Sequence, residues 1–154
     1  MNAHELALWL TTASAEVKDG RGFAGRPHST VVQAIASESI ADPVLGDAQH
    51  TAALLLVIAF RESSYRADVI GDGGRSCGLF QSACASTKLR DPVGQTRIAI
   101  GNIRRSITAC PDAILAMYAS GSCGNVAGRR ISVSRVAESQ RIIALVPVVA
   151  PVPS

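Results

Sequence analysis

Aromatic residues are scarce in this chain: only 4% of its 154 residues are Phe, Trp or Tyr, although 47% are hydrophobic. The core must therefore be built mainly from Ala, Val, Leu and Ile. The alternation of apolar and polar residues that is typical of strands is also scarce, whereas apolar residues recur at helical spacing. A chain of this length is enough for one domain. We expect a single, mainly α domain over 1–146, followed by an extended, proline-rich tail over 147–154.

Long apolar runs are also missing. The longest run, Ala52 to Phe60, has nine residues, whereas a membrane-spanning helix needs about 20. The start of the chain has no basic region, and the apolar stretch from Leu6 to Leu10 is too short for the core of a signal peptide. The sequence therefore predicts no membrane insertion and shows no secretory signal.

Neither sign of charge dominates the chain. The formal net charge of +3 would favour contact with an anionic polymer. The basic doublets Arg104-Arg105 and Arg129-Arg130 have no aromatic residues between them, so they do not predict a nucleic-acid site. Solvated helix and loop faces are the simpler interpretation of both doublets.

The four cysteines contain no C-x-x-C pair, and all three histidines precede them. This pattern argues against a zinc site. Cys77 and Cys84 flank the segment Gly78–Gln81, and Cys110 and Cys123 flank one expected helix. Either pair can form a disulfide in an oxidising compartment, and free buried thiols are equally consistent with the sequence.

Apolar spacing and turn formers predict six helices, at 3–17, about 29–39, about 48–65, 92–108, 112–118 and 132–146. We expect Ser29-Thr30 and Gly46-Asp47 to cap the second and third helices, and Pro111 to lie in the first turn of the fifth. Regular helical spacing fails between Ala67 and Pro92, where Gly71–Gly74 is dense in turn formers. That stretch predicts a glycine-rich loop or short hairpin beside a cleft, or an ordinary surface turn.

Glu62 follows the apolar run almost directly and is the leading candidate for catalysis. Burying a carboxylate is costly and raises its pKa, as a general acid working near neutral pH requires. The alternative is a structural glutamate at a helix end, paired with Arg61 or Arg66.

Three short motifs occur in a fixed order: Glu62-Ser63, Gly78-Leu79-Phe80-Gln81 and Met117-Tyr118-Ala119-Ser120-Gly121. They resemble the E-S pair, G-L-M/F-Q turn and A-Y-N-x-G stretch of the lysozyme-like lytic transglycosylases. Residues 71–81 are also similar to phage-associated members and, more distantly, to goose-type lysozymes. The resemblance covers about residues 50–146. It implies a lysozyme-like α+β fold with a central buried helix, and cleavage of the β-1,4 bond between N-acetylmuramic acid and N-acetylglucosamine in peptidoglycan.

The resemblance also implies catalytic roles. Glu62 would act as acid and then as base, while the 6-hydroxyl of the sugar closes a 1,6-anhydro ring. Tyr118 would point at this acid and help to position it. Ser63 would form hydrogen bonds within the site, although a helix-end hydroxyl bonded to a backbone carbonyl explains it nearly as well.

By the same resemblance, the second motif, Gly78–Gln81, would form one wall of the substrate groove. Gly78 would allow a close approach of sugar or an unusual backbone shape, and Gln81 would bind sugar or tie the loop to the body. Leu79 and Phe80 are either the floor of the cleft or core residues. The family's asparagine is replaced by Ala119, which removes one expected substrate contact.

A second carboxylate distinguishes hydrolysis from transglycosylation, because hydrolases need one to activate water or attack the sugar. Asp72 is the leading candidate and resembles an aspartate in the goose-type loop, with Asp68 and Asp91 weaker. An aspartate before glycine also stabilises tight turns without any catalytic role. The open alternatives are thus a muramidase that uses Asp72 and water, and a non-catalytic wall-binding module.

The resemblance implies no metal and no organic cofactor, and it makes peptidoglycan glycan strands the expected partner. The size of the chain and the absence of a visible signal fit a phage-type lysin or a virion-associated enzyme that acts on the cell wall or in the periplasm. We expect a monomer.

Overall fold

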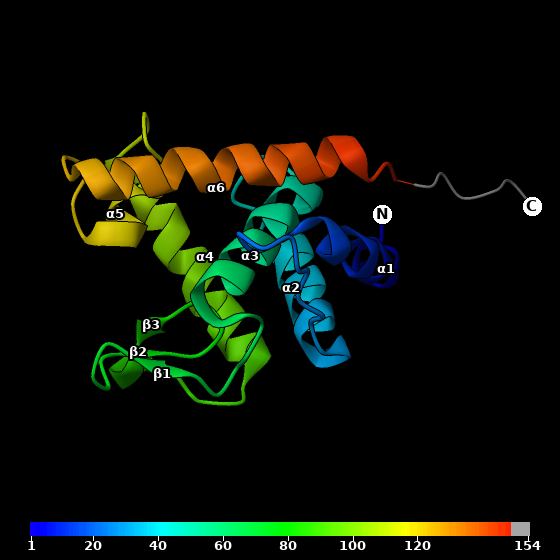
Figure 1. Cartoon of the computed structure of the whole chain (residues 1–154), viewed down its shortest axis with the longest axis horizontal. Helices are drawn as coiled ribbons and strands as arrows, with labels where there is room; N and C mark the ends of the chain where they lie inside the picture. The colour runs from blue at the N-terminus through cyan, green and yellow to red at the C-terminus, as the bar shows by residue number, and fades with distance from the viewer. Residues whose placement is uncertain (149–154) are drawn as a thin grey trace, which may run out of the picture.

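The computed structural model describes residues 1–148, and these are mainly helical with a small antiparallel sheet (Figure 1). The helices are α1 (Ala3–Ala13), α2 (Ser29–Ala41), α3 (Ala48–Ser63), α4 (Pro92–Ala109), α5 (Ala116–Ser120) and α6 (Val126–Leu145), with short 3-10 turns η1 (Ser14–Glu16) and η2 (Cys84–Ser86). Strands β1 (Ile70–Gly71), β2 (Ser76–Cys77) and β3 (Ser82–Ala83) pair in that order. The mainly α expectation and the short hairpin are confirmed. Most of the expected tail, residues 149–154, lies outside the described residues.

Helix α3 is the buried centre of the fold. Asp47 begins it by accepting a hydrogen bond from the His50 amide at 2.8 Å, as expected of an N-cap. Every residue from Thr51 to Phe60 is buried. Left-handed backbone at Ser64 and Tyr65 (φ 51° and 66°) ends the helix, slightly before the expected boundary at 65. Glu62 therefore lies in the last turn of a buried helix.

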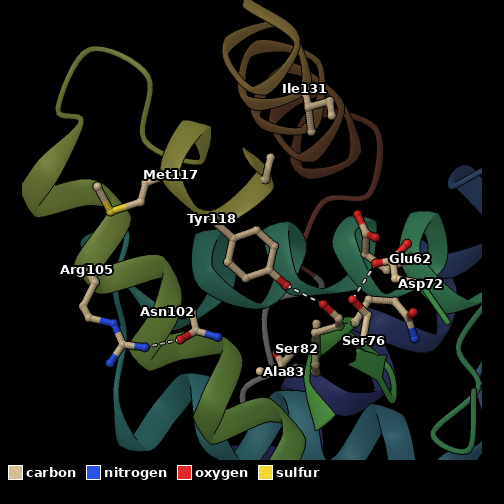
Figure 2. Close-up of a pocket in the computed structure, with 13 residues that line it drawn as sticks. Glu62, Asp72, Ser76, Ser82, Ala83, Asn102, Arg105, Met117, Tyr118 and Ile131 are labelled. Carbon is tan, nitrogen blue, oxygen red and sulfur yellow. Dashed lines mark hydrogen bonds between the residues drawn. The ribbon is translucent and has the colours of Figure 1, made fainter. Parts of the chain in front are cut away.

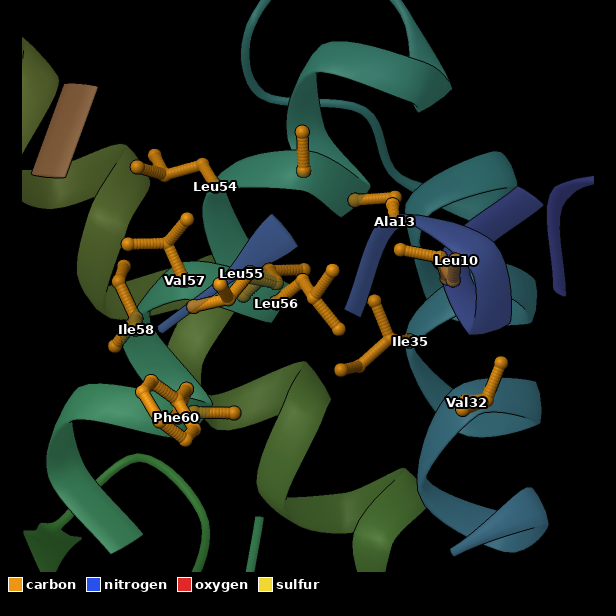
Figure 3. Close-up of a cluster of buried hydrophobic side chains, with 14 of the residues drawn as sticks. Leu10, Ala13, Val32, Ile35, Leu54, Leu55, Leu56, Val57, Ile58 and Phe60 are labelled. Carbon is orange, nitrogen blue, oxygen red and sulfur yellow. The ribbon is translucent and has the colours of Figure 1, made fainter. Parts of the chain in front are cut away.

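The other helices surround α3. Helix α6 runs across one side of α3, and α2 packs against both α1 and α4 (Figure 1). Figure 3 shows the aliphatic interface, in which Leu56 of α3 lies near Ile35 of α2. Full burial of a side chain of this size contributes roughly 1.5–3 kcal/mol. The sheet lies beyond the carboxyl end of α3, on the side away from α6 (Figure 1).

Two expected features at the amino-terminal end are wrong. The first helix ends at Ala13, where η1 tightens the chain, rather than at 17. The N-cap of α2 is His28 rather than Ser29 or Thr30, because the His28 ring accepts the Thr30 amide hydrogen bond at 3.3 Å.

Two carboxyl-terminal boundaries also differ from the expected ones. The segment from Pro111 to Leu115 forms tight turns, so α5 begins only at Ala116. Helix α6 begins at Val126 instead of 132. Its N-cap is Asn125, which accepts the amide hydrogen bond of Gly128. A Cβ on Gly128 would collide with α5, so this glycine lets the two helices approach closely.

Within residues 1–148, none of the helices combines the length and apolar character that crossing a membrane would require.

Candidate active site

A groove of about 510 Å³ lies where the sheet, α4, α5 and α6 meet the end of α3 (Figure 2). Five of the residues singled out from the sequence line it: Glu62, Asp72, Phe80, Gln81 and Tyr118. The remaining lining residues are Ser76, Ser82, Ala83, Asn102, Arg105, Met117, Ala119 and Ile131. Residues far apart in the sequence thus meet around one carboxyl group.

The Glu62 carboxyl group is partly buried, with 31% of the side chain exposed. Burial raises the pKa of Glu62 above its ordinary value, and the negative charge of Asp72 adds to the rise. Arg135 opposes both effects, because its Nη2 lies 3.3 Å from Oε1 of Glu62. Burial is the largest of these influences, so the protonated form is favoured relative to a free glutamate.

Two ion pairs connect the end of α3 to α6. Arg61 binds Glu138, with Nε 3.1 Å from Oε2, and the next residue, Glu62, faces Arg135. Arg135 and Glu138 are three positions apart on α6, so both lie on the same face of that helix. The structural pairs considered for Glu62 are not formed, since Arg61 is engaged by Glu138 and Arg66 lies 3.6 Å from Asp68.

Tyr118 lies in the middle of α5 and bridges to the opposite wall of the groove. Its hydroxyl donates a hydrogen bond to the main-chain oxygen of Phe80 at 2.9 Å rather than to Glu62 (Figure 2). Burial raises the pKa of Tyr118, and the nearby charge of Glu62 raises it further. The phenol therefore stays neutral and holds the two walls together next to the acid.

Three residues of the first two motifs lie behind the groove rather than in its lining. The Ser63 hydroxyl lies 2.9 Å from the main-chain oxygens of both Ala59 and Leu79. Leu79 is fully buried. Gly78 has a φ of 77°, and a Cβ there would lie 2.5 Å from the Gln95 side chain. Ser63 and Gly78 both agree with the alternatives that the sequence left open: the Ser63 hydroxyl bonds a helix carbonyl, and Gly78 allows an unusual backbone shape. These residues shape the turn from behind.

Gln81 and Asp72 line the groove but are also engaged within their loops. The Gln81 side chain donates through Nε2 to the Gly78 oxygen at 2.9 Å. Asp72 adopts a φ of 49° in the turn between β1 and β2, and its Oδ2 accepts a hydrogen bond from the Ser76 hydroxyl at 2.6 Å. Asp72 is thus both a turn-forming residue, as one interpretation of the sequence predicted, and part of the groove lining.

Both cysteine pairs that flank motifs are disulfide-bonded. Cys77–Cys84 closes the loop that carries Phe80 and Gln81, and Cys110–Cys123 closes the segment that contains α5. Each bridge therefore fixes one wall of the groove.

The groove lining also includes Asn102, which the sequence did not single out, and Arg105, which the sequence interpretation assigned to a solvated helix face. Arg135 is not part of the lining, but its guanidinium lies 3.3 Å from Glu62, and the sequence predicted no role for it. Asn102 and Arg105 are three positions apart on α4, and this spacing could have suggested a shared polar face. No local signal indicates that Arg135 faces Glu62, because 73 residues separate them. Within residues 1–148, no three His, Cys, Asp or Glu side chains are arranged to hold a metal ion.

No family model matches the chain, and no curated protein or solved structure matches it.

We predict that Arg135→Gln raises the pKa of Glu62 further. The substitution removes the one positive charge that opposes the effect of burial, so the carboxylate loses stabilisation while the neutral acid does not. Carbon-13 NMR titration of the Glu62 carboxyl group measures this directly. Arg130→Gln, an exposed position on the same helix, should leave the titration unchanged. An unchanged or lower pKa in the Arg135 variant would contradict the assigned electrostatics.

Proposed function

We propose that the chain is a lysozyme-like lytic transglycosylase that cleaves the β-1,4 bond between N-acetylmuramic acid and N-acetylglucosamine in peptidoglycan. The observation that carries this proposal is Glu62, a partly buried acid with a raised pKa that opens onto a groove of about 510 Å³. Such a volume is in the range of ligand-binding clefts. A carboxylic acid kept protonated beside a glycan can protonate the leaving oxygen as the glycosidic bond breaks.

The environment of Glu62 supports a role first as acid and then as base. Burial favours the protonated form that begins the reaction, whereas Arg135 favours the carboxylate that remains once the proton has been given away. The same carboxylate then takes the proton of the sugar 6-hydroxyl as that oxygen closes the anhydro ring. The acetamido group of the substrate assists, so no metal or organic cofactor takes part.

Two further features support a place of action at the cell wall. The two disulfides fit an oxidising compartment. The net charge of +3 favours contact with an anionic wall. We include in the proposal an origin as a phage lysin or virion component.

Asp72 supports a second candidate, a muramidase that hydrolyses the same bond. It lines the same groove as Glu62, and its charge contributes to the raised pKa of Glu62. A second carboxylate in this position could activate water or attack the sugar.

Asp72→Asn separates the two candidates. For a transglycosylase we expect the rate of cleavage to change by no more than a few-fold, because the substrate supplies the nucleophile. For a hydrolase that uses Asp72, the rate should fall by about 10²-fold or more. The release of soluble muropeptides from purified peptidoglycan gives the rate. Asp68→Asn, which lies outside the groove lining, is the matched control. The same assay tests the proposal as a whole: if wild-type protein releases no muropeptides, the proposed function is wrong.

A further inference from the structure

A second cavity, of about 350 Å³, adjoins the groove. The two share three lining residues, Ala83, Asn102 and Arg105. The rest of the second cavity is formed by small or apolar side chains of η2 and α4, namely Ser86, Ile98 and Gly101. A ligand in the groove therefore has room to extend a side branch past Arg105.

Arg105 differs from the other two arginines of α4 in the partner of its guanidinium group. Arg97 is ion-paired with Glu38 at 2.7 Å, and Arg104 is ion-paired with Asp42. Within residues 1–148, Arg105 has no carboxylate partner, and its guanidinium donates to the side-chain oxygen of Asn102. It is also the only cationic side chain that lines either cavity in the described part of the chain.

The position of this guanidinium suits an anionic branch of a ligand. Figure 2 places Arg105 and Asn102 on the opposite side of Tyr118 from Glu62. A guanidinium offers paired N–H donors that match the two oxygens of a carboxylate. The neighbouring small side chains leave space for short peptide side chains, and they supply no competing negative charge.

We propose that the second cavity binds the peptide branch of a muramyl residue, with Arg105 paired to a carboxylate of that peptide. The inference rests on the proposed function, in which the glycan occupies the main groove. Because the peptide is attached to a muramyl sugar of the glycan, it must leave the glycan path at the side of the groove. The adjoining cavity provides that exit, and Arg105 makes the enzyme favour peptide-bearing glycan over bare glycan.

Calorimetric binding to the full chain carrying Glu62→Gln tests this site without turnover. The two ligands are the N-acetylglucosaminyl-N-acetylmuramic acid disaccharide with a short peptide and the same disaccharide with its lactyl carboxyl group converted to a simple amide, so that only the first ligand has a carboxylate in its branch. We expect about fivefold tighter binding of the peptide-bearing ligand, as for an accessible charge pair. Adding Arg105→Gln should abolish this difference, while the matched Arg104→Gln should retain it.

Several results would overturn the inference. These are equal binding of both ligands, no binding of either, or a preference that survives Arg105→Gln. Binding of a glycerol-phosphate polymer through Arg105, without any preference for peptide, would also overturn it and would point to a phosphate site. Failure of the proposed function is detected by a separate measurement: in that case the wild-type protein releases no muropeptides from peptidoglycan.

Discussion

Replacing Glu62 with Gln should lower the rate of peptidoglycan cleavage by about 10³-fold or more. The amide keeps the shape of the side chain but cannot protonate the leaving oxygen. A positioned general acid contributes about 10²–10⁴-fold, and in the proposed mechanism the same group also serves as the base. The initial rate of muropeptide release from purified walls measures the effect, and circular dichroism shows whether the helical fold is kept.

A matched control separates catalysis from general charge effects. Glu16→Gln makes the same chemical change at a partly buried glutamate in η1 that does not line the groove. We expect this variant to cleave at the wild-type rate. If the Glu62 and Glu16 variants were equally active, Glu62 would not be the proton donor.

Loss of the Cys110–Cys123 bridge should have the second large effect, this time on stability. Its two cysteines are 13 positions apart, and for a closed loop of that length the chain-entropy model gives about 3 kcal/mol of stabilisation. The enclosed segment includes Tyr118, so we also expect slower cleavage from a looser groove wall. Urea unfolding of Cys110→Ser/Cys123→Ser, compared with wild type, measures the change in the free energy of unfolding.

The other bridge provides the comparison. Cys77–Cys84 joins cysteines only seven positions apart, so its removal should cost somewhat less, about 2.5 kcal/mol in the same chain-entropy model. If the Cys110→Ser/Cys123→Ser protein unfolded at the same urea concentration as wild type, the Cys110–Cys123 bridge would not stabilise the fold.

The sequence predicted the features that depend on local signals. The continuous apolar run from Ala52 to Phe60 identified the buried helix α3, and Asp47 marked its start. The glycines at 71–74 indicated the short hairpin. Together these signals placed Glu62 at a helix end beside a turn, where the structure has it.

What the sequence did not predict depends on contacts between distant segments. The close approach of α6 to α5 at Gly128 is not visible in any local pattern, although Asn125, the N-cap of α6, is a local signal for its early start that the sequence interpretation did not use. The ion-pair partner of Glu62 is Arg135 of α6, which lies 73 residues further along the chain. Similarly, Ser63 and Gly78 occupy motif positions, but their contacts with Leu79 and Gln95 direct them to the back of the turn.

The balance of charges at Glu62 links these long-range contacts to the proposed chemistry. Without Arg135, the remaining influences on Glu62, burial and the charge of Asp72, both raise its pKa and so favour the protonated form. With Arg135 at 3.3 Å, the carboxylate is also stabilised. A carboxyl group that first donates a proton and then accepts one works best when neither its protonated nor its ionised form is strongly disfavoured.

The mass of the fragments released in water enriched in the heavy oxygen isotope tests the central claim most directly. If Glu62 transfers the proton to the leaving sugar and then deprotonates the 6-hydroxyl, the products end in 1,6-anhydro-muramic acid and carry no isotope label. Labelled reducing ends would show that water is the nucleophile and would contradict the transglycosylase mechanism. The absence of fragments altogether would contradict the enzymatic role of Glu62.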